Sequence, residues 1–167
     1  MDRDKAAGYA YAAQLQAGLS QEAVASEAAR FARAWVPPRL VSATQGLRAL
    51  CEEAGLRPFV VSASALPIVL AAAPLAGFAP DSCRGIEVQV REERFTAELV
   101  QPVTYGAGKI DAASRSGRLV LACGDSFTGD LPMLEAAQIP VVVAPSGGSP
   151  LSIEARKRGW PVLSQES

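Results

Sequence analysis

Two carboxylates at the end of an apolar run are the strongest chemical signal in the sequence. Asp125 and Asp130 lie five residues apart in Cys-Gly-Asp-Ser-Phe-Thr-Gly-Asp, directly after the apolar residues 119–123. Magnesium takes oxygen ligands and keeps several of its waters, so one or two carboxylates are enough to hold it. The segment therefore predicts a magnesium site. The alternative, that Asp130 only caps the following helix, leaves a charged Asp125 at the end of a buried strand unexplained.

Two other segments carry groups that suit a phosphate. Val-Val-Ser-Ala-Ser over 60–64 places the Ser62 hydroxyl at the end of an apolar strand, where it can join backbone N–H groups around an anion. Taken alone, this segment is explained equally well by Ser64 as a helix N-cap. Lys109 follows Tyr-Gly-Ala-Gly at a predicted helix start, where a bound anion would offset its unfavourable position in the helix dipole. A solvated surface lysine is the alternative there.

The composition excludes several kinds of chemistry and partner. The 167 residues include no histidine, which removes Ser–His and Cys–His catalysis and every histidine-bound metal. The net charge is -1 without a basic stripe, so no nucleic-acid partner is expected. The three cysteines are widely spaced and predict a reducing, cytoplasmic location without disulfides. The longest apolar stretch, 65–80, is too short and too interrupted by proline to span a membrane.

The apolar periodicity alternates between helices and strands. It predicts helices at about 4–18, 21–36, 40–55, 65–76, 130–137 and 151–158, with a short one near 109. It predicts strands at 58–62, 119–123, 140–144 and 161–163, and a hairpin of 86–90 with 95–100. Helices that alternate with continuously apolar strands indicate an open, largely parallel α/β sheet covered on both faces. Ligands bind such sheets at the carboxyl ends of the strands, where Ser62 and Asp125 are expected.

In their order along the chain, VVSAS, YGAGK and GDSFTGD are similar to the second, third and fourth motifs of haloacid-dehalogenase (HAD) superfamily phosphatases, most of all the phosphoserine-phosphatase-like branch. The resemblance runs from about residue 39 to the C-terminus. It implies a HAD-like Rossmannoid three-layer sandwich with a mainly parallel sheet over 39–167, and a remnant of a helical cap over 1–38. It also implies a cytoplasmic, magnesium-dependent phosphomonoester hydrolase whose substrate is a small phosphorylated metabolite.

The resemblance further implies a role for each residue that matches a motif. Ser62 would hydrogen-bond a phosphoryl oxygen, and Lys109 would neutralise the phosphoryl group as charge develops on it. Asp125 would bind Mg²⁺ directly, whereas Asp130 would bind it directly or support its water shell. Enzymes of this family form an aspartyl-phosphate that water then hydrolyses.

The sequence departs from the family pattern at the nucleophile. The family carries it in a D-x-D-G-[TS] motif after an apolar strand, and the nearest match here, Asp2-Arg3-Asp4, follows no such strand. We therefore expect an N-terminally incomplete chain that lacks the first, central strand of the sheet and is inactive alone. The strands at 58–62 and 119–123 would then expose edges that recruit a strand from elsewhere or self-associate.

Two other functions compete with that of an incomplete phosphatase. One is a non-catalytic HAD-like protein that binds a phosphorylated ligand or a partner protein. The other is an unrelated α/β binding module, such as a receiver-like domain. Such a module would not need Lys109 together with the Asp125 and Asp130 pair, so it ranks last.

Four aromatic residues mark the two N-terminal helices. We expect their rings to pack between these helices, and the alternative is an aromatic box for a cationic head group. The four residues are Tyr9, Tyr11, Phe31 and Trp35.

Overall fold

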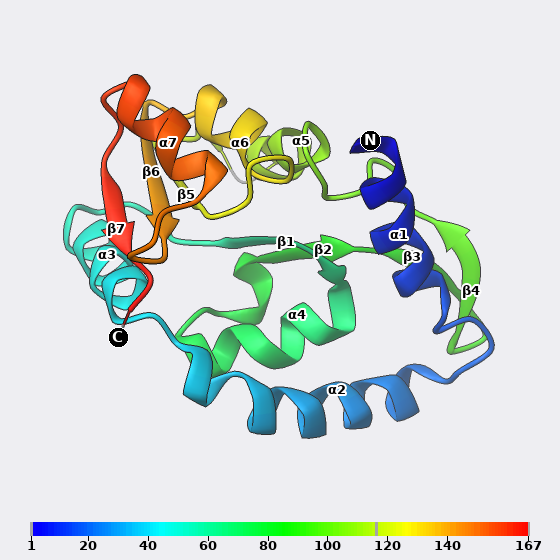
Figure 1. Cartoon of the computed structure of the whole chain (residues 1–167). Helices are drawn as coiled ribbons and strands as arrows, with labels where there is room; N and C mark the ends of the chain where they lie inside the picture. The colour runs from blue at the N-terminus through cyan, green and yellow to red at the C-terminus, as the bar shows by residue number, and fades with distance from the viewer. Residues whose placement is uncertain (1, 116, 167) are drawn as a thin grey trace. The chain divides into compact units, whose positions relative to one another are not determined.

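The computed structural model describes residues 2–115 and 117–166, with side chains described from Lys5 onward (Figure 1). The chain forms two compact units, each made of two separate stretches of sequence. The first unit combines Met1–Arg39 with Pro58–Tyr105, and the second combines Leu40–Arg57 with Gly106–Ser167. The expected division into a cap over 1–38 and a core over 39–167 stays a prediction.

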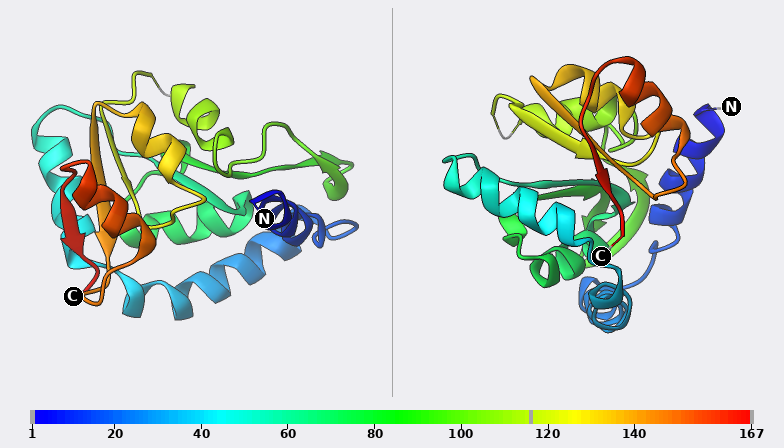
Figure 2. Two further views of the ribbon diagram at one scale, coloured as in Figure 1. Left: turned by 45° about the horizontal axis from the view of Figure 1, so that its top comes forward. Right: turned by 60° about the vertical axis from the view of Figure 1, so that its left-hand side comes forward.

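The first unit contains helices, short 3-10 turns and two pairs of strands. Its helices and turns are α1 (Asp2–Gln14), α2 (Gln21–Trp35), η1 (Pro37–Arg39), α4 (Leu66–Ala72), η2 (Ala73–Ala76) and η3 (Pro80–Ser82). Its strands are β1 (Val60–Ala65), β2 (Cys83–Ile86), β3 (Val88–Arg91) and β4 (Arg94–Leu99). Helix α2 lies along α4 (Figure 2). The buried face of α2 consists of the small residues Val24, Ala28 and Ala32.

Both ends of α2 follow local sequence signals. Ser20 is the N-cap, and its hydroxyl oxygen accepts a hydrogen bond from the Ala23 N–H at 3.2 Å. At the other end, Pro37 and Pro38 turn the chain into η1, because proline cannot continue the hydrogen bonding of an α-helix. The predicted bounds of this helix are confirmed.

Strands β1 and β2 run parallel, and β1 bulges at its carboxyl end. Val60 is paired with Cys83 and Val61 with Arg84, but the next pair is Ala65 with Ile86. Residues 62–64 therefore lie opposite a single residue of β2, an irregularity larger than the usual bulge of two residues against one, and it is called the bulge of β1 below. The prediction of one strand over 86–90 is wrong at its start, because Ile86 belongs to β2 and pairs with β1.

Ser64 lies in this bulge rather than at the start of a helix. The N-cap of α4 is Ala65, and it makes no side-chain capping bond. The alternative role of Ser64 as an N-cap is therefore wrong. The chain reaches α4 through Pro67 in the first turn, where the missing N–H of proline costs no helical hydrogen bond.

Strands β3 and β4 form the predicted antiparallel hairpin, and the connection between α1 and α2 adds to its outer edge. The Gly18 N–H donates to the Phe95 carbonyl at 2.8 Å, and the Phe95 N–H donates to the Leu19 carbonyl at 3.0 Å. Backbone hydrogen bonds thereby connect the segment between the N-terminal helices to a strand about 75 residues later in the first unit. The entropic cost of closing so long a loop is moderate, because this cost grows only with the logarithm of loop length.

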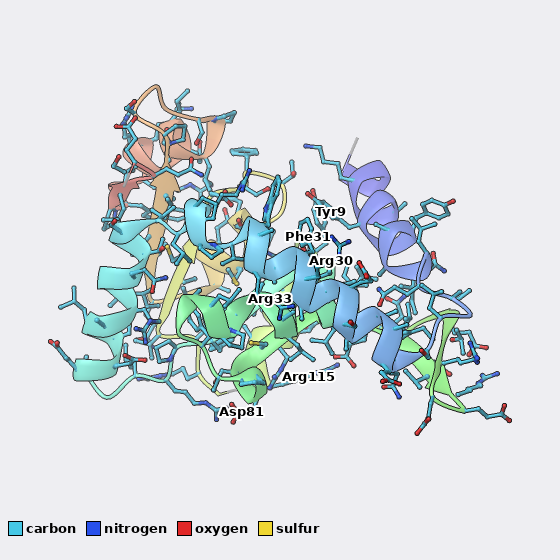
Figure 3. All side chains as sticks on the ribbon, turned by 90° about the horizontal axis from the view of Figure 1, so that it is seen from below. Tyr9, Arg30, Phe31, Arg33, Asp81 and Arg115 are labelled. Carbon is cyan, nitrogen blue, oxygen red and sulfur yellow. The ribbon has the colours of Figure 1, made fainter. Side chains whose placement is uncertain are left out.

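The aromatic residues of the N-terminal helices form separate pairs. The rings of Tyr9 and Tyr105 lie 5.4 Å apart, and those of Phe31 and Trp35 stack at 5.5 Å. Figure 3 labels Tyr9 and Phe31. The guanidinium carbon of Arg39 lies 3.4 Å from the centre of the Trp35 ring. The expected packing of four rings between the two N-terminal helices is wrong, because all four side chains are exposed: Tyr9 to 46%, Tyr11 to 64%, Phe31 to 45% and Trp35 to 49%.

The second unit is an α/β unit with a parallel sheet. Its helices are α3 (Ser42–Glu53), α5 (Gly108–Ser114), α6 (Leu131–Ala136) and α7 (Pro150–Lys157). Its strands are β5 (Leu121–Gly124), β6 (Ile139–Ala144) and β7 (Val162–Ser164), in the order β5-β6-β7 with parallel pairing throughout. Residues 141–144 of β6 are buried, as are Leu134 of α6 and Leu151 of α7, which pack on the sheet. The prediction of parallel, continuously apolar strands is confirmed.

Strands β1 and β5 each have an edge without a strand partner among the described residues. In the first unit β1 pairs only with β2, and in the second unit β5 pairs only with β6. An edge of this kind leaves a row of backbone N–H and C=O groups without ladder bonds. Both strands were expected to have such an edge, and what covers it stays a prediction.

No helix in the described ranges is long and apolar enough to cross a membrane.

Candidate functional site

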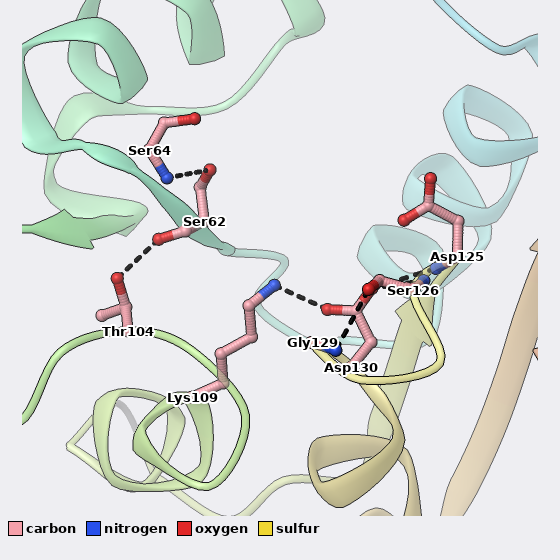
Figure 4. A network of polar contacts seen from close by, with 8 residues as sticks. All are labelled: Ser62, Ser64, Thr104, Lys109, Asp125, Ser126, Gly129 and Asp130. Carbon is pink, nitrogen blue, oxygen red and sulfur yellow. Dashed lines mark hydrogen bonds and ion pairs between the residues drawn. The ribbon is translucent and has the colours of Figure 1, made fainter. Parts of the chain in front are cut away.

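Asp130 is the centre of a polar network in the second unit (Figure 4). One of its carboxylate oxygens accepts hydrogen bonds from the backbone N–H groups of Asp125, at 3.1 Å, and Ser126, at 2.9 Å. The other oxygen accepts a hydrogen bond from the Lys109 ammonium group at 2.6 Å. Asp130 occupies the N-cap position of α6, but its side chain makes no capping bond to that helix. The alternative that it serves only as a cap is therefore wrong.

Lys109 and Asp130 form a buried ion pair. Lys109 is 8% exposed and Asp130 is 4% exposed, so the alternative of a solvated surface lysine is wrong. A buried charge is costly unless it is paired and hydrogen-bonded, and each of these side chains supplies that partner to the other. Lys109 also lies in the first turn of α5, where the carboxylate offsets the repulsion between its charge and the helix dipole.

Short hydrogen bonds fix the loop that carries the two carboxylates. The Ser126 hydroxyl oxygen accepts from the Gly129 N–H at 3.0 Å, and the Ser126 carbonyl accepts from the Asp130 N–H at 2.9 Å. The segment before Lys109 is attached to the same loop, because the Gly106 N–H donates to the Gly129 carbonyl at 3.2 Å. The end of β5, the loop and the start of α5 are therefore held together by hydrogen bonds.

Gly124 provides the space in which Asp130 approaches the backbone of β5. A Cβ atom at this position would lie 2.6 Å from the Asp130 Cβ and 2.8 Å from its Cγ. Neither distance is compatible with van der Waals contact, so the site needs a residue without a side chain here. Sequence reasoning identified Asp125 and Asp130 but not this requirement. The signal available was a glycine placed directly between an apolar strand and Asp125.

Asp125 is exposed to solvent, and its backbone N–H donates to the buried Asp130 carboxylate. Partial desolvation, and after it the negative charge of Asp130, raises the pKa of the Asp125 carboxyl above its ordinary value. A cation would favour the ionised form of Asp125, and the Lys109 ammonium group, which acts in that direction, is itself bonded to Asp130. In the described part of the chain no group of three or more Cys, Asp or Glu side chains could hold a metal. Protein ligands would then be these two carboxylates with water elsewhere, which fits Mg²⁺ better than a four-ligand Zn²⁺ site.

We expect the Asp125→Asn variant to be more stable than the wild type at pH 7 without divalent cations. A carboxyl whose folded pKa is raised loses stability as pH rises from the unfolded value of 3.8 through the folded value, and asparagine does not ionise. The difference between the two proteins should vanish below the unfolded pKa. Magnesium at ten times its Kd should stabilise the wild type by about 1.4 kcal/mol and leave this variant unchanged.

Thermal unfolding at pH 7 and at a pH below the unfolded pKa of Asp125, with EDTA or with MgCl₂, measures these differences in stability. Asp111→Asn is the matched control, because Asp111 is exposed in the same unit on α5 and makes none of the hydrogen bonds of the polar network described above. Magnesium should stabilise that variant as it does the wild type. Equal stabilisation of Asp125→Asn by magnesium would contradict the assignment of Asp125 as a ligand.

Cys123 does not supply a nucleophile to this site. Burial raises the pKa of its thiol to about 11, and the charges of Asp130 and Asp125 act in the same direction. The thiol is therefore protonated at neutral pH, and the thiolate is the reactive form of cysteine.

Ser62 lies in the bulge of β1 in the first unit. Its hydroxyl oxygen accepts a hydrogen bond from the Ser64 N–H at 3.1 Å, and its carbonyl accepts one from the Thr104 hydroxyl at 2.6 Å (Figure 4). Sequence reasoning missed Thr104, whose bond spans 42 residues of chain. The second unit brings Lys109 and the two carboxylates together, and their roles in binding, like that of Ser62, stay predictions.

The chain belongs to the haloacid dehalogenase-like hydrolase family, whose sequence model matches residues 3–135. No curated protein sequence matches it. The family usually depends on magnesium. The side chain of Asp2, at the nearest match to the family's nucleophile motif, falls outside the described side chains.

Solved structures with a similar fold come from several bacteria. A protein of unknown function from Bordetella pertussis Tohama I has a TM-score of 0.80 at 21% identity, covering 94% of this chain and 73% of its own. A phosphoserine phosphohydrolase-like protein from Francisella tularensis has a TM-score of 0.54 at 15% identity, covering 74% and 58%. A HAD-family hydrolase from Salmonella enterica serovar Typhi has 0.50 at 20% identity, covering 69% and 39%. At these identities the likeness shows the fold, a mixed α/β fold with parallel strands.

Proposed function

We propose that this chain forms the magnesium- and phosphate-binding part of a phosphomonoester hydrolase that acts on a small phosphorylated metabolite. The observation that supports this most directly is the network around Asp130. The buried Lys109 ammonium group pairs with the buried Asp130 carboxylate, and a second, exposed carboxylate, Asp125, lies five residues before Asp130 in the loop after β5. Membership of a hydrolase family agrees with the proposal. The binding partner is then the metabolite rather than nucleic acid or a membrane.

Each residue of the proposed site has a distinct task. Asp125 and Asp130 would hold Mg²⁺, which supplies positive charge to a phosphoryl group. Lys109 would add a second positive charge, and its ion pair with Asp130 limits the rotamers of its long side chain. Ser62 would donate its hydroxyl proton to a phosphoryl oxygen, since its hydroxyl oxygen already accepts from the Ser64 N–H.

Phosphate binding by the full chain tests this function. Inorganic phosphate titrated into the protein in a calorimeter should bind only when Mg²⁺ is present. In the Asp125→Asn variant, magnesium should no longer promote phosphate binding. In the Asp111→Asn variant, magnesium should promote it as in the wild type. Equal affinity for phosphate with and without magnesium would refute the proposed site.

We expect the chain alone to hydrolyse no p-nitrophenyl phosphate at a measurable rate. The proposed site residues bind and orient a phosphoryl group, but the sequence contains no D-x-D-G-[TS] motif to accept it. Release of p-nitrophenol is followed by absorbance, with and without MgCl₂. A magnesium-dependent turnover that Asp125→Asn abolishes would overturn this expectation and would direct attention to Asp2 as nucleophile.

A non-catalytic protein that binds a phosphorylated ligand or a partner protein is the second candidate. The same lack of a D-x-D-G-[TS] motif favours it. The edges of β1 and β5 would suit a strand-donating partner or self-association. The resemblance implies a three-layer sandwich whose sheet has one further, central strand next to β1 and β5, and this stays a prediction. We also propose a cytoplasmic location, since Cys51, Cys83 and Cys123 are free thiols.

A further inference from the structure

The bulge in β1 shapes the segment that contains Ser62. Between the pairs Val61 with Arg84 and Ala65 with Ile86, β1 has three residues and β2 has one. Ser62 therefore has no register partner on β2 in the described structure. A bulge re-aims the side chains that it contains and frees backbone groups from the ladder. Both effects fall on the strand end that carries the proposed phosphate-binding hydroxyl.

Gly85, opposite the bulge, allows the two strands to approach closely. A Cβ atom at this position would lie 2.9 Å from the Ser64 carbonyl oxygen and 2.9 Å from the Leu66 Cα. Both neighbours are backbone atoms, which cannot move aside as the end of a flexible side chain can. One side of the bulge is therefore fixed by backbone contact with β2.

Thr104 fixes the other side. It is 5% exposed, and its hydroxyl donates to the Ser62 carbonyl at 2.6 Å. Ser62 is partly buried, and the Thr104 hydroxyl gives its carbonyl a hydrogen-bond partner in the segment where the register of β1 and β2 is irregular. The Ser62 hydroxyl oxygen accepts from the Ser64 N–H at 3.1 Å, so the peptide and the side chain of Ser62 are both held. The Ser62 hydroxyl donates to no acceptor among the described residues, so its proton is available to a ligand.

We propose that Thr104 is a positioning residue for phosphate, acting through its hydrogen bond to the Ser62 carbonyl to set the direction of the Ser62 hydroxyl. This inference rests on the proposed function, because Ser62 must contact the ligand. Thr104 itself does not touch the ligand. Its contribution should therefore depend on its hydroxyl group and on the presence of the Ser62 side chain.

The test is calorimetric titration of inorganic phosphate, with Mg²⁺, into the full chain and its variants. Thr104→Val removes the donor and keeps the side-chain shape, so we expect phosphate affinity to fall about three- to tenfold. Thr104→Ser keeps the donor and should bind within about twofold of the wild type. Thr44→Val is the matched control, because the Thr44 hydroxyl also donates to a backbone carbonyl, that of Val41 at 2.7 Å, but at the start of α3 in the second unit. That variant should bind phosphate as the wild type does.

A double-mutant cycle separates positioning from general destabilisation. In the Ser62→Ala background, Thr104→Val should cause no further loss of affinity, because Thr104 acts only through Ser62. A full additional loss there, or wild-type affinity in Thr104→Val, would overturn the inference while the proposed function stands. A wild-type chain that binds no phosphate would overturn both. If the Thr104→Val variant does not fold, Thr104→Ala takes its place in the cycle. A tenfold loss of phosphate affinity in a folded Thr104→Ser variant would also overturn the inference.

Discussion

Gly124→Ala should be among the most destabilising single substitutions in the chain, with a loss of about 3 kcal/mol in the free energy of unfolding. The added methyl would occupy the position of the Asp130 side chain, since the two Cβ atoms would lie 2.6 Å apart. Either β5 or Asp130 must then move, and movement of Asp130 breaks its bonds to Lys109 and to two backbone N–H groups. Urea unfolding followed by circular dichroism measures the loss. Stabilisation by magnesium should disappear in the same variant.

Gly147→Ala is the matched control for this substitution. Gly147 also follows a strand of the second unit, but nothing lies within 4 Å of the place where its Cβ would be. Its stability should remain within about 0.5 kcal/mol of the wild type. A Gly124→Ala protein as stable as Gly147→Ala would show that the close approach of Asp130 to β5 is wrong.

Lys109→Met should cost about 3–5 kcal/mol, because it leaves the buried Asp130 carboxylate without its charged partner. Methionine keeps much of the length and apolar volume of the lysine stem, so the loss reports the charge rather than a cavity. Two backbone N–H groups would still bond to Asp130, and this sets the loss toward the lower end of the range.

Arg158→Met provides the comparison for an exposed ion pair. Arg158 bonds to Glu154 and Glu135 at the surface of the same unit, where solvent screens the interaction. Unfolding of that variant should be close to that of the wild type in urea. If Lys109→Met and Arg158→Met unfold at the same urea concentration, the burial of the Lys109 and Asp130 pair is contradicted.

Local signals predicted most of the elements, and distant contacts account for what was missed. The cap at Ser20, the proline stop after α2 and the apolar strands β5 and β6 each depend on neighbouring residues, so the sequence was sufficient for them. Strand β2 is four residues long and contains Arg84 and Gly85, and it is a strand because β1 lies beside it. Neither its propensity nor its periodicity could show that pairing.

The candidate site shows the same division between local and distant information. The positions of Asp125 and Asp130 after an apolar strand were readable from the sequence. The direction of the Asp130 side chain depends on its contact with Lys109, which is 21 residues away in the sequence. The sequence alone therefore could not show whether Asp130 caps a helix or forms a buried ion pair. The contact between Thr104 and the Ser62 carbonyl spans 42 residues and left no pattern in the sequence.

The interleaved composition of the two units affects the order in which they can form during translation. The apolar face of α2 in the first unit finds α4 only after residues 66–72 have been made, and residues 18–21 meet β4 later still. Meanwhile α3, which belongs to the second unit, has already been synthesised and must wait for residues 106–167. Although domains generally fold as units from the N-terminus onward, here a ribosome starts the second unit before it has completed the first. The folding of the two units therefore overlaps in time.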